Sequence, residues 1–489
     1  MIHKIPLENT MTVRVRFAPS PTGYLHIGGA RTAMYNYLFA KAMGGKYILR
    51  IEDTDTERSE RKFEEAQIED LKWLNLQHDE GPDAGGDYGP YRQSERLHIY
   101  KEWAQKLIDN NQAYHCFCTE AELTAKKEIA VAANLPPHYD GKCRNVSKDE
   151  AAKRMAAGEE AVIRFKTPLK SYEFTDHVRG HVVFPEGMVG DFVCVRANGL
   201  PVYNYAVVVD DITMKISHVI RAEEHLPNTL RQLMFYEAFG ANPPEFAHAS
   251  LLIGEDRQKL SKRHGATSVR LYQEQDYIPS AMLNYLLLLG WSHPEELEIF
   301  DVHQLGTLFN IDRFIKSPAI YDIKKLDFIN GQHLRLLPTD ELIAKVEKIL
   351  PAEHPFLKME KEWKERCVTL SKEKMNFFKD IIPLLELYFG NEISTEADYV
   401  EARSWETTPK IQEYLLGEVT KARAAGKSFV TEADYNEWSN HVKGELKIKG
   451  KQLFMGIRAA LTLQAHGSDL KFIVPLTPLE ILEKRLKMS

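Results

Sequence analysis

The sequence predicts an α/β fold built on a parallel sheet, interrupted by a long insertion and followed by a C-terminal region that is entirely helical. Three observations lead to this prediction. A strand, a turn, a helix and a second strand follow one another near the N-terminus, a further strand and helix occur far along the chain, and helical periodicity prevails from about residue 334. With 489 residues the chain exceeds one ordinary core, so three or more domains are expected.

The first strand–helix–strand unit occupies residues 13–51. Apolar side chains alternate with arginines over residues 13–17, which is the period of a strand, and the turn-rich residues 19–23 follow. Gly44 ends the next helix, and residues 47–51 form the second strand. The helix itself is predicted from apolar residues at helical spacing, namely Ala30, Ala33, Met34, Tyr37 and Leu38.

A glycine pair, Gly28 and Gly29, stands where the first strand gives way to this helix. Free backbone amides and the helix dipole favour a phosphate there, and glycine lets the backbone approach it closely. His26, just before the pair, could donate a hydrogen bond to a phosphate oxygen. A tight turn with an incidental histidine explains the same residues, so this segment alone leaves both interpretations open.

A second candidate phosphate-binding segment follows a short predicted strand at residues 251–253 and a loop at residues 254–258. It begins at Lys259 and continues through Ser261 and Lys262. Two lysines three residues apart on a loop could close over a triphosphate and neutralise it. Taken alone, such a run is also typical of a solvated basic surface.

The remaining elements follow from the same periodicities. Residues 57–74 read as an acidic helix, residues 216–220 as a strand, and the helix after that strand ends at Gly240. Residues 281–289 form another helix. Thr339 is predicted to cap the first helix of the C-terminal region.

Together, the histidine–glycine turn (His26-Ile27-Gly28-Gly29) and the lysine segment (residues 259–263) resemble the HIGH and KMSKS motifs of class I aminoacyl-tRNA synthetases. Longer blocks resemble the bacterial-type glutamyl-tRNA synthetases in particular. These blocks are residues 16–23 (RFAPSPTG), 50–55 (RIEDTD), 89–94 (GPYRQS) and 259–268 (KLSKRHGATS).

Two departures separate the chain from the related glutaminyl-tRNA synthetases. Those enzymes typically carry a Pro-Glu-Pro-Asn version of the first block and a complete HIGH motif, whereas this chain has PSPT at residues 19–22 and ends its motif in Gly29. The glutaminyl enzymes also carry β-barrels where this chain is helical. The PSPT block and the final Gly29 favour glutamate as the substrate, and the helical region separates the chain from the glutaminyl enzymes.

The resemblance implies an α/β Rossmann-type catalytic domain, split by an insertion that binds the acceptor end of tRNA, and an all-α anticodon-binding region. The expected reaction is ATP-dependent attachment of L-glutamate to tRNA(Glu), through a glutamyl-adenylate, with Mg²⁺. The implied domains are 1–97 plus 203–254 (catalytic), 98–202 (insertion), 255–333 (lysine loop and tRNA stem contact) and 334–489 (anticodon binding, with a break near 400).

The resemblance also implies roles for individual residues. The catalytic and ATP-binding residues would be His26, Gly28, Gly29, Lys259, Ser261 and Lys262. The glutamate pocket would be formed by Arg16, Ala18, Ser20, Glu52, Tyr203 and Arg221.

The chemistry of glutamate agrees with this pocket. Arg16 and Arg221 follow or end predicted strands, where ligands bind in open α/β sheets, and a guanidinium makes two charge-assisted hydrogen bonds to a carboxylate. Glu52 would pair with the ammonium group. An arginine facing the neutral amide of glutamine loses its ion pair, so charge rather than shape would reject glutamine. A surface ion pair is the alternative explanation for each arginine.

The insertion contains one candidate metal site. Cys116 and Cys118 lie close together, and Cys143 follows after a stretch of basic and small residues. Three thiolates and a fourth ligand, His138 or Tyr139, could hold zinc tetrahedrally, and the family pattern favours Tyr139. Three free thiols are the alternative. The other two cysteines, Cys194 and Cys367, are predicted to lie in the core.

The composition indicates a cytoplasmic globular protein. Hydrophobic residues make up 44% and charged residues 27%, no apolar run reaches membrane-spanning length, and five scattered cysteines form no disulfide framework. The net charge is −7, but residues 443–489 contain nine Lys or Arg and only four Asp or Glu. Candidate tRNA contacts are Lys374, Lys447, Lys449, Lys451 and Arg458, although solvated helix surfaces explain them equally well.

The resemblance implies tRNA(Glu), L-glutamate and ATP as partners, no DNA and no membrane, and a monomer. Three alternatives concern the tRNA. In discriminating relatives an arginine reads the third anticodon base, whereas the corresponding residues 371–375 offer lysines, so charging of tRNA(Gln) stays open. A non-catalytic tRNA-binding paralogue is disfavoured by His26 and the two lysines. A truncated paralogue that modifies a tRNA base would lack the helical region.

Overall fold

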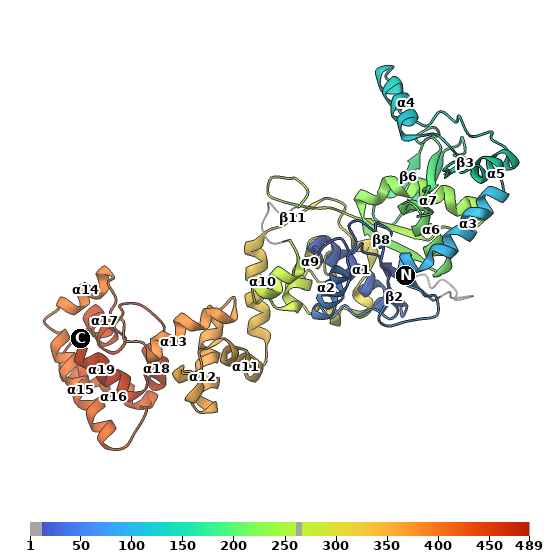
Figure 1. Cartoon of the computed structure of the whole chain (residues 1–489). Coiled ribbons are helices and arrows are strands. Elements are labelled where there is room, and N and C mark those ends of the chain that lie inside the picture. Colours follow the sequence, from blue (N-terminus) through green and yellow to red (C-terminus); the bar gives the residue numbers. More distant parts are fainter. Residues whose placement is uncertain (1–11, 261–266, 489) are drawn as a thin grey trace, which may run out of the picture. The chain divides into compact units, whose positions relative to one another are not determined.

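The computed structural model describes residues 12–260 and 267–488. It divides the chain into two compact units, Met1–Ile329 and Asn330–Ser489. Figure 1 shows helices and strands in the first unit and helices alone in the second. The predicted fold class, a mixed α/β region followed by an all-helical one, is therefore confirmed. The four domain boundaries proposed above stay predictions.

The first unit alternates helices and strands along most of its length. In chain order its elements are β1 (Arg14–Phe17), α1 (Ile27–Ala42), β2 (Lys46–Leu49), α2 (Arg61–Trp73), α3 (Leu97–Asp109), β3 (Ala113–Cys116), α4 (Glu120–Ala132), α5 (Lys148–Ala156), β4 (Val162–Phe165), β5 (Tyr172–Asp176), β6 (Gly180–Phe184), β7 (Phe192–Val195), α6 (Tyr203–Thr213), β8 (His218–Ala222), α7 (Leu226–Ala238), β9 (Glu245–Ala249), β10 (Leu252–Ile253), α8 (Val269–Glu274), α9 (Pro279–Leu288) and β11 (Ala319–Ile320). Helix α10 (Ile323–Leu336) follows.

A mixed sheet supports the candidate site. β8 pairs in parallel with β9, β9 pairs in parallel with β5, and β6 runs antiparallel to β5. β1 and β2 form a parallel pair beside β8, because the amide of Ser217 donates to the carbonyl of Arg14 at 2.9 Å. The sheet is mixed rather than wholly parallel, since the β5–β6 hairpin, which lies in the predicted insertion, adds to its edge.

Strand β1 is buried along its whole length, including its two arginines. Arg14 forms an ion pair with Glu80, with Nη1 2.6 Å from Oε1, and its guanidinium lies over the ring of Tyr88. Arg16 forms an ion pair with Asp211. The alternation of apolar residues and arginines thus marks buried ion pairs and not a solvent-facing edge.

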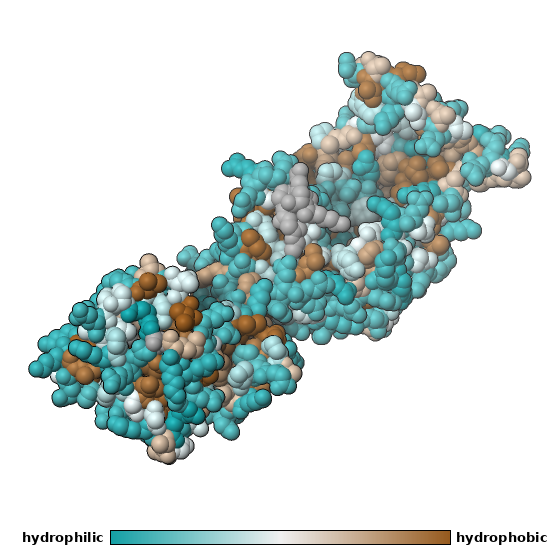
Figure 2. Space-filling view, turned by 60° about the vertical axis from the view of Figure 1, so that its left-hand side comes forward, coloured by the Kyte–Doolittle hydropathy of each residue, from teal (hydrophilic) through white to brown (hydrophobic). Residues whose placement is uncertain are grey.

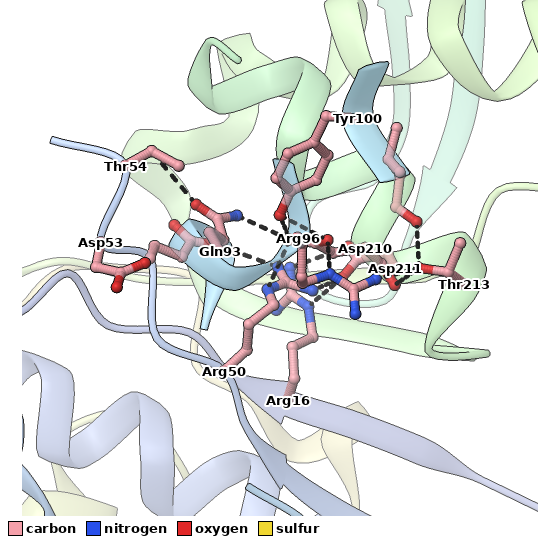
Figure 3. A network of polar contacts seen from close by, with 12 residues as sticks. Arg16, Arg50, Asp53, Thr54, Gln93, Arg96, Tyr100, Asp210, Asp211 and Thr213 are labelled. Carbon is pink, nitrogen blue, oxygen red and sulfur yellow. Dashed lines mark hydrogen bonds and ion pairs between the residues drawn. The ribbon is translucent and has the colours of Figure 1, made fainter. Parts of the chain in front are cut away.

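A buried charge network joins the two halves of the catalytic fold (Figure 3). Arg50, which follows β2, donates from Nη1 to Asp211 at 2.6 Å and from Nη2 to Glu52 at 3.1 Å. Arg16 donates from Nε to the same Asp211 at 3.1 Å. Burial acts to raise the pKa of Asp211, but the charges of Arg16 and Arg50 lower it overall. Asp211 therefore stays ionised between two arginines.

The neighbouring Asp210 collects donors from residues just before α3 and within it (Figure 3). It accepts from Arg96 Nε at 2.7 Å, from Gln93 Nε2 at 2.8 Å, and from the Tyr100 hydroxyl at 2.9 Å to each carboxylate oxygen. Arg96 also donates to the hydroxyl of Thr213. Each described side chain of the network makes at least one hydrogen bond, and Arg50 Nε, which makes none, lies 3.7 Å from Asp210 Oδ2 as an ion pair. Buried charges are tolerated when they are paired in this way.

The rest of the predicted insertion has a small sheet of its own, in which β4 pairs antiparallel with β3 and with β7. Helix α4 starts with a capping box between Thr119 and Glu122 but buries none of its residues. Figure 1 shows α4 projecting from this sheet, and Figure 2 shows apolar side chains at its end. Ile129 is 70% exposed and Leu135, just after the helix, is 61% exposed.

Several predicted boundaries match the structure closely. Helix α1 ends at Ala42, and Gly44 takes the predicted left-handed conformation with φ at +62°. The capping prediction for Thr339 is wrong: α11 begins at this residue, Pro338 is its N-cap, and no side chain caps it. The predicted core cysteines, Cys194 and Cys367, are both fully buried.

The second unit contains no strand among its described residues, 330–488. In one hydrophobic core of this unit α15, α17 and α19 pack together through Ile411, Leu415, Ile457, Leu461 and Leu482. In the described ranges of the chain, no helix has the length and apolar character needed to cross a membrane. The helices that follow α10 are α11 (Thr339–Ile349), α12 (Lys361–Ser371), α13 (Ile381–Phe389), α14 (Ala397–Ser404), α15 (Thr408–Ala424), α16 (Glu432–Gly444), α17 (Gly450–Thr462), α18 (Leu470–Ile473) and α19 (Leu479–Met488).

The charge network predicts a large difference between two carboxylate substitutions. Asp210→Asn keeps the shape of the side chain but leaves buried arginines short of a negative charge, which should cost about 3–5 kcal/mol of unfolding free energy. Asp55→Asn, in an exposed pair with Arg58, should leave the unfolding transition unchanged. Thermal unfolding of both variants measures this difference, and equal transitions would contradict it.

Candidate active site

A cavity of about 650 Å³ lies where β1 and β8 end and α1 begins. It brings together segments that are more than 200 positions apart, since residues from Arg16 to Lys259 line it. The predicted residues on its wall are Arg16, Ala18, Ser20, His26, Gly28, Gly29, Glu52, Tyr203, Arg221 and Lys259. The predicted Ser261 and Lys262 lie outside the described residues.

His26 is held by the helix that it starts. It is the N-cap of α1, and its Nδ1 accepts the amide hydrogen of Gly28 at 3.1 Å. Burial, together with the charge of Lys259, lowers the pKa of His26. The neutral imidazole therefore carries its remaining hydrogen on Nε2, as a donor.

The His26 cap reduces the number of backbone amides that the glycine pair can donate to a phosphate. The amide of Ile27 donates to the carbonyl of Thr267 at 2.9 Å, and the amide of Gly28 is taken by His26. Of the first-turn amides, that of Gly29 has no acceptor in the part of the chain that the structure describes, so it can meet an anion. A Cβ on Gly29 would lie 3.2 Å from Leu25 Cδ1, so this position has little room for a side chain.

Lys259 reaches the cavity wall from the segment after β10. Its Nζ forms an ion pair with Glu224, which also lines the cavity. The side chain of Lys259 is 65% exposed, so this pair is accessible to solvent and contributes little to stability. A phosphate entering the cavity can replace Glu224 as the partner of the ammonium group.

The two predicted substrate arginines have different surroundings. Arg16 lines the cavity but is already paired with Asp211. Arg221 donates from Nε to His248 Nε2 at 3.1 Å, and its Nη2 is bonded to neutral oxygens. No carboxylate among the described residues lies within ion-pair distance of Arg221, whose Nη1 has no acceptor there. Burial lowers its pKa, as expected for a cation without a counterion.

Two other predicted residues complete the polar wall. Glu52 is bonded to Arg50, and burial raises the pKa of Glu52 against the opposing charges of Arg50 and Arg16. Tyr203, the first residue of α6, has its hydroxyl 3.2 Å from Nδ1 of His225. Burial lowers the pKa of His225 to about 4, so this imidazole is neutral at neutral pH.

Sequence reasoning missed the residues that hold Arg221. They are Asp176, Thr229, Gln232 and His248, and each is buried. They lie on three different elements, β5, α7 and β9, and belong to no sequence motif, so only the fold brings them together. Asp211 and Arg50 were missed for the same reason, although Arg50 begins one of the blocks that resemble the family, residues 50–55.

The three insertion cysteines form a compact cluster. The sulfur atoms of Cys116, Cys118 and Cys143 lie within 4.8 Å of one another, and Cys118 Sγ is 3.7 Å from Cys143 Sγ. The hydroxyl of Tyr139 is 3.4 Å from the sulfurs of Cys116 and Cys118. His138 does not join a group of possible metal ligands among the described residues. The three sulfur atoms and the Tyr139 hydroxyl thus form one cluster.

Comparison with known proteins decides the family. The model of the catalytic domain of class I tRNA synthetases for glutamate and glutamine matches residues 12–328, and that of an anticodon-binding domain matches residues 341–488. The chain belongs to the class I glutamate–tRNA ligases. A glutamate–tRNA ligase of Bdellovibrio bacteriovorus is 46% identical over 486 residues, covering 98% of each chain. One of Heliobacterium modesticaldum is 44% identical and covers 94% of this chain and 93% of the relative.

Solved structures agree with this ligase family. A crystal structure of a glutamate–tRNA ligase from Elizabethkingia meningosepticum in complex with its amino acid is 32% identical, with a TM-score of 0.88. The match covers 98% of this chain and 99% of that one. The enzyme is therefore a glutamate–tRNA ligase that charges tRNA(Glu) with glutamate at the expense of ATP.

The predicted tRNA-contact residues of this ligase lie in its second unit. Lys449 is the N-cap of α17, and Lys451 is exposed and paired with Glu401. Arg458 is half-buried farther along the same helix. Lys374, on another segment, donates to the hydroxyl of Ser468, and Lys447 has a φ of +55° just before α17. Phe454, which the sequence analysis did not include, is 66% exposed between Lys451 and Arg458.

The capping geometry of His26 predicts that two substitutions differ in stability. His26→Ala removes the acceptor for the Gly28 amide and should cost about 1 kcal/mol of unfolding free energy. His26→Asn keeps an acceptor at the N-cap and should cost much less. Urea unfolding of the two variants tests this. The capping role is disproved if both lose the same stability.

Proposed function

We propose that the cavity binds glutamate with its side-chain carboxylate on Arg221. The observation that carries this proposal is a buried guanidinium held by neutral acceptors, with Nη1 lacking a partner among the described residues. A buried cation without a counterion is costly, and a substrate carboxylate removes that cost by forming charge-assisted hydrogen bonds. The neighbouring Arg16 is already neutralised by Asp211 and orients the pocket rather than providing a free positive charge.

The ammonium group of glutamate belongs at Glu52. This carboxylate lines the cavity, is buried, and keeps its position through Arg50. Burial raises its pKa, and a substrate cation would favour the ionised form again. Tyr203 and Ser20, on the same wall, supply hydroxyl groups for the polar atoms of the amino acid.

The phosphates of ATP belong between His26, Gly29 and Lys259. In the first step an α-carboxylate oxygen of glutamate attacks the α-phosphorus, and the bond to the bridging oxygen of pyrophosphate breaks. The Nε2 hydrogen of His26, the Gly29 amide and the Lys259 ammonium stabilise the charge that develops on the phosphate oxygens. Ser261 and Lys262, outside the described residues, are assigned to the same task from the sequence alone.

Mg²⁺ fits this arrangement as a partner of the nucleotide. Glu224 is the lining carboxylate that is not committed to a buried arginine, so it would hold the ion. Bound Mg²⁺ neutralises phosphate charge and takes most of its ligands from phosphates and water.

The second step transfers the glutamyl group to tRNA. A hydroxyl of the terminal ribose attacks the carbonyl carbon of the mixed anhydride and AMP leaves, which yields glutamyl-tRNA. No protein nucleophile is needed in either step, so the enzyme contributes positioning and charge stabilisation. The α17 face with Lys451, Phe454 and Arg458 suits the anticodon loop, because cations meet phosphates and an exposed ring can stack on a base.

Zinc fits the cysteine cluster of the insertion. Zinc–sulfur bonds of about 2.3 Å in a tetrahedron place sulfur atoms about 3.8 Å apart, which agrees with the 3.7 Å between Cys118 and Cys143. The hydroxyl of Tyr139 would complete the four ligands. The ion would fix the segment after β3 against the loop before α5, and it lies in the insertion rather than at the adenylate site.

Substitution of Arg221 tests the glutamate pocket. Arg221→Gln should raise the KM for glutamate by roughly a hundredfold, because the carboxylate loses a buried charged partner, while the KM for ATP stays unchanged. Lys41→Gln removes an equal charge from the exposed end of α1 and is the matched control. Steady-state charging of purified tRNA(Glu) measures both constants. An unchanged glutamate KM in Arg221→Gln would disprove the pocket.

Metal analysis tests the zinc site. The purified enzyme should contain stoichiometric zinc, and Cys143→Ser should lose it together with thermal stability of the insertion. Cys194→Ser, at a buried cysteine outside the cluster, should keep the metal. Elemental analysis and limited proteolysis within residues 116–146 provide the readouts. Absence of zinc from enzyme prepared without chelators would rule the site out.

A further inference from the structure

A line of buried hydrogen bonds runs from the predicted insertion to the substrate-binding arginine. It starts at Asp176, the last residue of β5, passes through His248 in β9, and ends at Arg221 in β8. Nδ1 of His248 lies 2.5 Å from Oδ2 of Asp176, and Nε2 of His248 lies 3.1 Å from Nε of Arg221. All three residues are at least 95% buried, since their exposed fractions are 1%, 0% and 5%.

The hydrogens along this line can be placed without ambiguity. Arg221 has only donors, so Nε2 of His248 must accept, and the imidazole hydrogen must be on Nδ1, facing Asp176. The hydroxyl of Thr229 accepts from Arg221 Nη2 at 2.9 Å and lies 3.3 Å from the same His248 Nε2. Gln232 accepts from Nη2 through its side-chain oxygen at 2.9 Å. The network therefore requires one tautomer of His248.

Asp176 is fixed strongly enough to select that tautomer. Its Oδ1 accepts the amide hydrogens of Val178 at 2.9 Å, Arg179 at 2.8 Å and His248 at 3.2 Å. These three donors lock the carboxylate at the turn after β5, and Oδ2 receives the imidazole of His248 at 2.5 Å as well as the His248 amide hydrogen at 3.2 Å. Burial acts to lower the pKa of His248, and Asp176 opposes this effect. The geometry alone, however, already places the hydrogen on Nδ1.

The arrangement holds Arg221 without neutralising it. The three hydrogens on Nε and Nη2 go to an imidazole nitrogen, a hydroxyl and an amide oxygen, none of which is charged. The carboxylate of Asp176 lies one residue farther away, so it orients the guanidinium only through His248. Nη1 has no hydrogen-bond acceptor within residues 12–260 and 267–488, so its two hydrogens could meet a ligand in the cavity that Arg221 lines.

We propose that Asp176 and His248 are positioning residues for glutamate selection: Asp176 sets the tautomer of His248, and His248 holds Arg221 in the orientation that receives the substrate carboxylate. This inference rests on the proposed role of Arg221 and extends it to a strand of the insertion. The predicted consequence is that selection of the acidic amino acid depends on a residue that never touches the substrate.

Asp176→Asn reverses the tautomer while keeping the shape of the side chain. The asparagine oxygen stays with the three backbone amides, so its NH2 group faces Nδ1 of His248, which must then accept. The imidazole hydrogen moves to Nε2 and opposes the Nε hydrogen of Arg221. The KM for glutamate should rise at least about tenfold, with smaller changes in kcat and in the KM for ATP.

His248→Gln supplies the rescue. Its side-chain carbonyl reaches the position of the imidazole Nε2 and accepts from Arg221 whatever residue stands at 176. The single variant should therefore have a glutamate KM close to that of the parent enzyme, and His248→Gln combined with Asp176→Asn should recover most of the KM that Asp176→Asn alone loses. Glu80→Gln, which breaks the buried pair with Arg14 outside the cavity, is the control for loss of stability without loss of glutamate binding.

The tautomer itself has a readout that does not depend on activity. In enzyme labelled with ¹⁵N-histidine, the signals missing from His248→Gln identify His248, and their shifts show which ring nitrogen carries the hydrogen. Hydrogen on Nδ1 in the parent enzyme and on Nε2 in Asp176→Asn supports the proposal. An unchanged tautomer in Asp176→Asn overturns it, and so do additive KM effects of the two substitutions. If Arg221→Gln raises the glutamate KM and Asp176→Asn does not, only this inference fails. An unaffected Arg221→Gln overturns the glutamate pocket as well.

Discussion

The active site depends on the burial of charge at one junction of the fold. Arg16 and Arg50, from the first part of the chain, meet Asp210 and Asp211, from α6 beyond the insertion, and almost no solvent reaches them. Such groups are stable only when each has its partners, so the two halves of the catalytic fold must dock in one arrangement. The same contacts place Glu52 and Arg16 on the cavity wall. The same ion pairs thus hold the two halves of the fold together and position the side chains of the pocket.

Within this setting, the charges of the cavity are not equivalent. Arg16 is neutralised by a carboxylate of the protein, whereas Arg221 is held by neutral groups and keeps its charge for a ligand. His26 caps α1 with its Nδ1, which accepts the amide hydrogen of Gly28, and its Nε2 remains a donor. In both cases a structural hydrogen bond fixes the orientation of a side chain that lines the cavity. Preorganisation of this kind lowers the cost of binding because little is left to be ordered.

Much of the fold and of the candidate site could be predicted from the sequence, and the contacts that could not be predicted share one cause. The strand and helix periodicities located β1, α1 and α7, and short motifs located the segments around His26 and Lys259, because these signals are local. The partners of buried arginines are not local: Asp211 is 195 positions from Arg16, and Asp176 is 72 positions from His248. The sequence also could not show that both arginines of β1 are buried. Apolar residues alternate with charged ones in a half-exposed strand, and they alternate in the same way in a buried strand whose charged residues form ion pairs.

The pairing of β5 with β9 has a consequence for how such enzymes diverge. An insertion that contacts the rest of the protein only at its two ends can be replaced by another one, because no other contact changes. Here β5, a strand of the predicted insertion, pairs with β9, and its last residue accepts hydrogen bonds from the backbone amide and the imidazole of His248. A chimera that takes this segment from a distant homologue therefore inherits a foreign sheet edge along with it. Substitutions in β5 and in β9 must therefore remain compatible with each other as such enzymes diverge.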